Sequence, residues 1–520
     1  MKKLTGILIL FAILCNCSWA KDATDNVNIS TAELKYPLHE TRAVWLTTIG
    51  GIDWPHTYAN AGVSPEIQQR ELCNILDKLC EANINTVILQ TRIRATTIFP
   101  SEMEPWDGAL SGKPGQSPGY DALAFAIEEC HKRGMMVHAW VVTIPIGKWN
   151  GAGCRNLRAK HPELVKKIGE EGFMNPEAEG TADYLARFCK DIVSRYDVDG
   201  IHLDYIRYPD TWGKIANKDK ARNNITRIVK RIAESVKGVK DYVELSCSPV
   251  GKYADTKRQW SHGWNARDIV CQDVALWMKE GWMDAIYPMM YFKNENFYPF
   301  AIDWKERSAG KTVAPGLGIY MLHPRERNWA LQDVTRELWV LRQYGMGNCL
   351  FRSKFFTDNT KGIYNFYTNS FAPYPAIPNV PPKSNGKVLY HLYGSDTYPV
   401  DTTNPENLLA VNLTNPNVEH SRTKNIQYFK LVKNTDDRGD NNNDGEDDEE
   451  KEEKEENHSM LNLPDGTLLV ISTVQGTDYT SAIVRDGRIN TDNLPAGHYK
   501  AYVINKKGHK HLIKRFSIEP

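Results

Sequence analysis

The chain has 520 residues, a formal net charge of zero and a hydrophobic content of 41%, with 14 Trp and 24 Tyr. That length allows one large domain and one smaller domain, each with a buried core. The even charge balance, without a concentrated basic stripe, argues against nucleic acid as a partner. The acidic residues are concentrated instead, since residues 436–456 hold six Asp and seven Glu against three Lys or Arg.

Residues 1–20 predict an export signal. Two lysines precede an apolar run over residues 4–14, and residues 18–20 (SWA) fit a cleavage site. Cleavage there would release an exported bacterial protein, either periplasmic, at the cell surface or secreted. A competing interpretation makes Cys17 a lipid-anchored amino terminus. No later apolar run reaches the roughly 20 residues that a membrane helix needs, so no integral membrane span is expected.

Eight strand-like runs alternate with amphipathic helical runs. The strands are expected at residues 43–48, 86–91, 136–142, 200–205, 243–249, 285–291, 314–320 and 348–352. Helical spacing of apolar residues is found at 65–82, 120–133, 181–196, 225–239, 266–280 and 331–344. A strand and a helix repeated eight times predict an α/β fold, a parallel (β/α)8 TIM barrel over residues 36–373.

The composition changes after residue 373. Residues 374–384 are rich in proline and predict a stiff linker. Residues 385–520 contain seven short β-like runs, which favour a small all-β sandwich of immunoglobulin or fibronectin type. The acidic stretch at 435–458 is expected to be a disordered insert. Residues 440–445 resemble half of a calcium loop, but Lys451 stands where a bidentate Glu belongs.

Asp204 is the strongest catalytic candidate. It lies in residues 199–209 (DGIHLDYIRYP), where period-two alternation puts His202, Asp204 and Ile206 on one strand face and Ile201, Leu203 and Tyr205 on the other. In a barrel the first face points to the axis, and chemistry is kept at the carboxyl ends of the strands. The alternative is a structural Asp paired with Arg207 or with a neighbouring strand.

Other strand ends add acids, cations and aromatic rings, which is the composition of a sugar site. Cleavage of a glycosidic bond needs two carboxyl groups, and the second is sought in Asp53, Glu295 or the loop acids Glu102 and Glu104. The expected substrate-binding residues are Trp54, Gln90, Arg92, Trp106, Trp140, His202, Tyr205, Arg207, Tyr287 and Tyr291.

A metal site is the weaker alternative. His202 and Asp204 share a strand face, and His138 on the neighbouring strand is the only further ligand in view. The eight cysteines after the leader are scattered without zinc-site spacing, which is typical of small buried hydrophobes. No metal and no cofactor are therefore expected.

The chain resembles the glycosyl hydrolase-like 10 family. The resemblance is carried by residues 41–48 (TRAVWLTT), 52–55 (IDWP), 199–209, 248–251 (SPVG) and 287–291 (YPMMY). It implies an exported bacterial (β/α)8 protein that hydrolyses a polysaccharide, with cell-wall glycan as a family-level expectation. It carries over Asp204 as the catalytic residue, with site residues Asp53, Arg92, Tyr205, Arg207 and Tyr291.

The leading hypothesis is an exported glycoside hydrolase acting on an oligosaccharide or polysaccharide through carboxylate acid/base chemistry. Two rivals stay open. The first is a carbohydrate-binding barrel without catalysis, and the second is a metal-dependent deacetylase or amidase.

Overall fold

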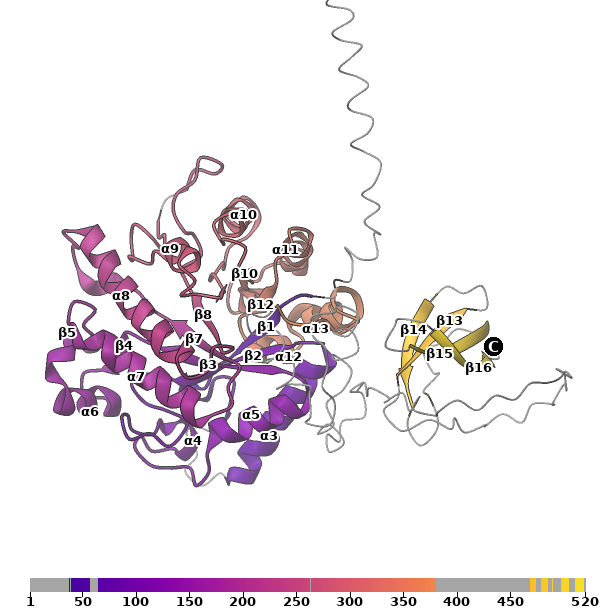
Figure 1. Cartoon of the computed structure of the whole chain (residues 1–520), viewed down its shortest axis with the longest axis horizontal. Coiled ribbons are helices and arrows are strands. Elements are labelled where there is room, and N and C mark those ends of the chain that lie inside the picture. The colour runs from indigo at the N-terminus through magenta and orange to yellow at the C-terminus, as the bar shows by residue number, and fades with distance from the viewer. Residues whose placement is uncertain are drawn as a thin grey trace, which may run out of the picture. The chain divides into compact units, whose positions relative to one another are not determined.

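The computed structural model describes residues 37–379, apart from 38, 57–63 and 262, and the segments 468–473, 478–484, 489, 497–504 and 510–518. The first part is a mixed α/β fold in which helices surround a curled parallel sheet (Figure 1). The later segments form a separate antiparallel sheet.

The curled sheet contains nine strands that pair in parallel in the order β10-β9-β8-β7-β3-β2-β1-β12-β11. Their bounds are β1 Arg42–Leu46, β2 Thr86–Arg92, β3 Met136–Val142, β7 Gly200–Asp204, β8 Glu244–Ser248, β9 Ala285–Ile286, β10 Thr312–Val313, β11 Gly316–Leu317 and β12 Asn348–Leu350.

The two ends of this order are successive pieces of one chain segment. β10 pairs with β9, and β11, three residues further along, pairs with β12. Gly316 of β11 also forms a parallel bridge with Met289, just after β9. The interruption falls at Pro315, which has no N–H to donate to a neighbouring strand. Residues 312–317 therefore bring the two edges of the sheet together.

Helices cover the outside of the curled sheet (Figure 1). They are α3 Pro65–Glu81, α4 Gly108–Ser111, α5 Ala122–Lys132, α7 Gly180–Arg195, α8 Lys218–Lys237, α9 Val274–Lys279, α10 Tyr298–Glu306, α11 Leu331–Gln343, α12 Ser353–Thr357 and α13 Ile363–Phe366. Side chains cap three of them: Asp107 accepts from the N–H group of Ala109, Asp121 from those of Leu123 and Ala124, and Asn217 from that of Lys220.

Apolar side chains form one large core between sheet and helices and a smaller core inside the curl. Ile201 and Leu203 of β7 belong to the large core. Trp45, Trp140 and Tyr287 belong to the inner one. The alternation predicted for β7 is thus confirmed for Ile201 and Leu203, which share the strand face that packs against the helices.

The structure adds elements that the sequence pattern did not predict. Between β3 and β7 the chain forms β4 Pro145–Lys148, α6 Ala152–Lys160, β5 Val165–Ile168 and β6 Glu171–Met174, with the antiparallel order β4-β6-β5. The helix expected at 266–280 begins only at Val274, because Cys271 adopts a left-handed φ of 64° that a helix cannot contain.

The later part of the chain contains β13 Leu468–Thr473, β14 Asp478–Ile483, β15 Gly497–Ile504 and β16 Lys510–Ile518, in the antiparallel order β14-β13-β15-β16. They overlap the last four β-like runs of the sequence. The predicted leader with Cys17, residues 380–384 of the linker, the first three β-like runs and the acidic insert lie outside the described residues.

Two compositional expectations concern cysteines and membrane spans. Six of the eight described cysteines are buried and two are intermediate, and all eight are free thiols. Within the described ranges, no helix combines the length and the apolar character needed to cross a membrane.

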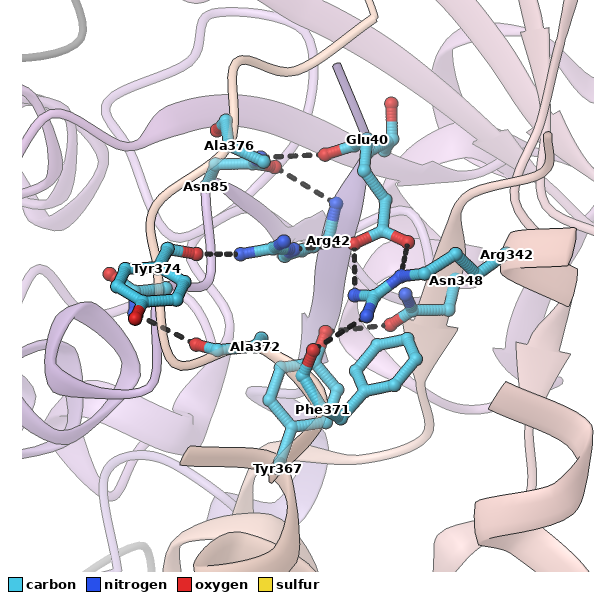
Figure 2. A network of polar contacts seen from close by, with 12 residues as sticks. Glu40, Arg42, Asn85, Arg342, Asn348, Tyr367, Phe371, Ala372, Tyr374 and Ala376 are labelled. Atoms are coloured by element: carbon cyan, nitrogen blue, oxygen red, sulfur yellow. Dashed lines mark hydrogen bonds and ion pairs between the residues drawn. The ribbon is translucent and has the colours of Figure 1, made fainter. Parts of the chain in front are cut away.

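A buried ion cluster joins the first strand to the last long helix, at the amino-terminal side of β1 (Figure 2). The Glu40 carboxylate accepts from Nε of Arg42 at 2.6 Å and from Nε and Nη2 of Arg342 at 2.7 and 2.6 Å. The three residues are 1–5% exposed. Charges buried this deeply need close counter-charges, which each of them has.

The same cluster holds the chain that leaves the α/β fold (Figure 2). Arg342 Nη1 donates to the carbonyl of Phe371, and Arg42 Nη1 to that of Tyr374, each at 2.6 Å. Asn85 Nδ2 donates to the carbonyl of Ala376 at 2.9 Å. Residues 374–377, expected to begin a stiff linker, are therefore bound to the amino-terminal side of the sheet.

We predict that Glu40→Gln lowers the free energy of unfolding by about 3 kcal/mol, because it leaves two buried guanidinium groups without a counter-charge. Urea denaturation measures it. Glu234→Gln, which breaks only the exposed contact with Lys230, is the matched control and should cost less than about 1 kcal/mol. Equal costs for the two variants would contradict a stabilising role for the cluster.

Candidate active site

Asp204 ends β7 at the carboxyl-terminal rim of the curled sheet, where it remains partly exposed. Its Oδ1 accepts from Ser248 Oγ at 2.8 Å and from the backbone N–H of Tyr205 at 2.7 Å. Its Oδ2 accepts from Trp140 Nε1 at 3.0 Å. Donors from β3, β8 and its own loop therefore fix both carboxyl oxygens in one orientation.

The strand ends in a sharp turn directly after Asp204. Tyr205 has a φ of 54°, in the left-handed region that costs a bulky residue energy. The Arg207 N–H donates to the Tyr205 carbonyl at 2.9 Å, and the Tyr205 hydroxyl donates to Asp210 Oδ1 at 2.9 Å. The alternation predicted through residues 205 and 206 stops here, and Ile206 joins the outer core.

Burial raises the pKa of Asp204 above the usual aspartate value. The hydrogen bonds from Ser248, Trp140 and Tyr205 and the charge of Arg207 oppose that shift without cancelling it. The negative charge of Asp204 adds to the burial that raises the pKa of Tyr291 well above 10, so this phenol stays protonated near the carboxylate. A carboxyl group with a raised pKa can hold a proton for donation.

Two expected substrate-binding residues lie deeper, inside the curl. His202 is 0% exposed, and its Nδ1 lies 3.0 Å from Ser246 Oγ. Tyr287 is 1% exposed and donates to Glu244 Oε1 at 3.3 Å. Burial lowers the pKa of His202 well below 6.5, which keeps the ring neutral. Both side chains pack the interior and are out of reach of a substrate.

Arg92 is likewise placed away from any substrate. It is 0% exposed, and its Nε and Nη2 donate to the Glu104 carboxylate at 2.7–3.0 Å. Glu104 also accepts from the Tyr184 hydroxyl at 3.1 Å. This buried ion pair fastens the loop after β2 to the sheet and to α7, which removes Glu104 from the possible second acids.

Three further candidates near β1 hold the loop that follows it. Asp53, 1% exposed, accepts from the Thr47 N–H at 2.9 Å and pairs with Arg352. Trp54 is 0% exposed and donates to a carbonyl of α3, and Gln90 accepts from two N–H groups of residues 48 and 49. An Asp held between Thr47 and Arg352 has the contacts of a structural ion pair.

The remaining expected residues lie nearer the surface. Trp106 is half-buried, and its backbone bridges to Thr97. Glu295 is exposed on η4 Asn294–Asn296, after β9. Among the acids and cations at the rim, sequence reasoning missed Asp210. Its only sequence signal is that it directly follows the 199–209 motif.

The metal alternative has little support in this geometry. Across the described part of the chain, no group of three or more His, Cys, Asp or Glu side chains is arranged to hold a metal ion. His202 faces Ser246 and Trp45, whereas the Asp204 oxygens face Ser248 and Trp140. The two side chains therefore do not converge on one point.

We predict that replacing Asp204 by Asn makes the stability difference from wild type depend on pH. A raised folded-state pKa means that the native protein binds more protons than the unfolded chain above about pH 3.9, so wild type loses stability as the pH rises from there. Melting temperatures of both proteins between pH 3 and 7 measure this. A difference that stays constant, or that moves in favour of wild type as pH rises, would contradict the raised pKa.

Comparisons with known proteins agree with the sequence motifs. The chain matches the model of the glycosyl hydrolase-like 10 family over residues 40–221 and 215–324. Glycosyl hydrolase YngK of Bacillus subtilis is 29% identical over 381 residues, covering 66% of this chain and 74% of that protein. Glycosyl hydrolase DigH of Escherichia coli K12 is 29% identical over 336 residues, covering 56% and 76%.

Among solved structures, the PgaB (BpsB) glycoside hydrolase domain of Bordetella bronchiseptica aligns with 64% of this chain and 99% of its own, with a TM-score of 0.46 and 13% identity. The family match spans more than half of the 520 residues and includes the Asp204 segment. The chain belongs to the glycosyl hydrolase-like 10 family.

Proposed function

We propose that this protein is an exported glycoside hydrolase that cleaves an oligosaccharide or polysaccharide, with Asp204 as the essential carboxyl group. Membership of a glycosyl hydrolase-like family supports the reaction class. The observation that carries the proposal is the state of Asp204: partly exposed at the strand end, held by three donors, and raised in pKa by burial.

Those properties suit the proton donor of glycosidic cleavage. The departing sugar oxygen needs a proton, and an ordinary aspartate is ionised at neutral pH. A raised pKa keeps a larger share of Asp204 protonated, and the fixed donors aim the group. Trp140 would hold Asp204 in place through its indole N–H, and Tyr291, whose pKa the Asp204 charge raises, would offer a ring and a neutral hydroxyl to the sugar.

The second carboxyl group would come from the exposed acids around the rim. The Asp53 and Glu104 carboxylates are committed to buried arginine contacts. Asp210 lies in the loop of Asp204 and is linked to it through Tyr205, and Glu295 follows β9. We propose that either Asp210 or Glu295 activates the water or attacks the sugar, and the assay below distinguishes these two residues.

The architecture we propose around this site is a closed (β/α)8 barrel over residues 36–373, followed by a β-sandwich over 385–520 that supports the glycan. Pairing of residues 312–317 with both β9 and β12 supports closure of the barrel. The four-stranded antiparallel sheet over residues 468–518 supports the sandwich. We also propose that residues 1–20 direct export.

We predict that reducing-end release from a glycan panel, including peptidoglycan strands with and without stem peptides, is seen with wild type and falls about 1,000-fold in Asp204→Asn, within the range for removal of an acid/base group. Asp210→Asn and Glu295→Gln are assayed in parallel, and a comparable loss in one of them identifies the second acid. Asp183→Asn, an exposed acid paired with Arg231 on the helical side, is the control and should keep full turnover.

Wild-type turnover by a folded Asp204→Asn protein would refute the assignment. Glycan binding without product, in wild type and variant alike, would favour the binding-protein alternative. Activity that chelators remove and that depends on His202 would favour the deacetylase or amidase.

A further inference from the structure

Five arginines are buried in the described structure, and one of them lacks a close counter-charge. Arg42 and Arg342 meet Glu40, Arg92 meets Glu104, and Arg133 meets Asp77 and Glu129, all at 2.6–2.7 Å. Arg207 is 6% exposed, like the others, but its nearest carboxylate is Asp210 at 4.0 Å. That carboxylate already accepts from the Tyr205 hydroxyl.

The guanidinium of Arg207 is also poorly satisfied as a hydrogen-bond donor. Its Nη1 makes a long bond of 3.3 Å to the carbonyl of Tyr208, and its Nε is buried without any partner. A buried donor without an acceptor and a buried cation without an anion are both costly. The other four buried arginines avoid that cost. Arg207 therefore lacks an anionic partner that a bound ligand would supply.

Aromatic rings hold the guanidinium in place. It lies 3.6 Å from the centre of the Tyr205 ring and 5.3 Å from that of Trp264. Stacking between rings fixes the plane of a guanidinium and leaves its edge for a partner. Trp264 is 45% exposed, although tryptophan is mostly buried in proteins, so part of its side chain is accessible to a ligand.

The position of Arg207 links it to the proposed chemistry. It lies three residues after Asp204, past the left-handed Tyr205, and its charge acts on the Asp204 carboxyl. Arg207 and Asp204 therefore belong to one short segment after β7, which places Arg207 near the glycan that we propose at Asp204.

We propose that Arg207 and Trp264 form a subsite for an acidic sugar, in which the sugar carboxylate pairs with the Arg207 guanidinium and the sugar ring lies on Trp264. This rests on the proposed glycosidase function and names the substrate class: a glycan with carboxylate-bearing units at or next to the cleaved bond. A planar carboxylate matches the edge of a guanidinium through two parallel hydrogen bonds. A neutral sugar would leave the buried cation without its counter-charge.

Binding to matched glycans tests the subsite independently of turnover. Calorimetric titration uses the full-length Asp204→Asn protein, in which the glycan stays intact, with oligogalacturonate and peptide-free peptidoglycan strands as probes. Each probe is used as the free acid and after its carboxyl groups are converted to methyl amides. We expect at least one acid to bind ten-fold or more tightly than its amide, since charge-assisted hydrogen bonds are worth about 1.5–3 kcal/mol.

Substitutions at Arg207 assign that preference to the residue. Arg207→Met in the same background should bind acid and amide alike. Arg207→Lys should restore part of the preference for the acid, because lysine keeps the positive charge but lacks the planar guanidinium that forms two parallel hydrogen bonds. Arg258→Met should keep the preference, because it removes an exposed arginine that pairs with Glu306 and lies in the β8–α9 loop, the loop of Trp264. Absence of any preference for an acid, or a preference that survives Arg207→Met, would overturn the subsite while leaving the hydrolase assay unaffected.

Thermal stability separates this role from a structural one. Removing a buried cation that has no counter-charge should leave the melting temperature of Arg207→Met at or above that of its parent. Arg92→Met, which strands the buried Glu104, should lower it by several degrees. A loss in Arg207→Met as large as in Arg92→Met would mean that Arg207 is a structural residue, contrary to the proposal.

Discussion

The contact between Glu40 and the two guanidinium groups of Arg42 and Arg342 is the interaction on which the curled sheet depends. It ties the first strand to α11 and to the chain that leaves the α/β fold. Its geometry follows from a general constraint: a charge withdrawn from water must meet an opposite charge and satisfied donors. The pairs Arg92–Glu104 and Arg352–Asp53 obey the same constraint near the opposite rim, where they fix the loops after β2 and β1.

Asp204 and Arg207 at the rim both lack a close counter-charge, and they lie within four residues of each other. Asp204 accepts hydrogen bonds from neutral donors only, so burial raises its pKa, and Arg207 has no carboxylate closer than 4.0 Å. The strained turn at Tyr205 separates the two charges and directs them to different neighbours. Charged groups left without a close counter-charge beside a strand end are typical of functional sites. A glycan with a leaving oxygen and a carboxylate would satisfy both.

The sequence predicted much of the architecture because its signals are local. Apolar alternation at residues 136–142 matches β3, and helical spacing at 65–82 matches α3 to within one residue. The β4–β6 hairpin region and the late start of α9 were missed, since short half-exposed strands such as Val165–Ile168 and a left-handed Cys271 leave no periodic signal. The motif 199–209 located Asp204, but residue type alone could not separate substrate contacts from packing.

Whether a polar side chain contacts the substrate or packs inside the protein depends on its partners in the tertiary structure. Arg92 and Arg207 read alike in the sequence, each just beyond a strand end, yet one meets Glu104 and the other has no close anion. The sequence made Asp53 a candidate for the second acid, but Arg352, some 300 residues away, pairs with it in the fold. Long-range pairs of this kind cannot be derived from local pattern.

A crystal structure of the Asp204→Asn protein with an uncleaved oligosaccharide would test the central claim most directly. The account predicts a glycosidic oxygen within hydrogen-bond distance, about 3 Å, of the side chain at position 204, with sugar rings on both sides of it along the rim. A glycan bound elsewhere, or bound at the rim with no glycosidic oxygen near position 204, would contradict it.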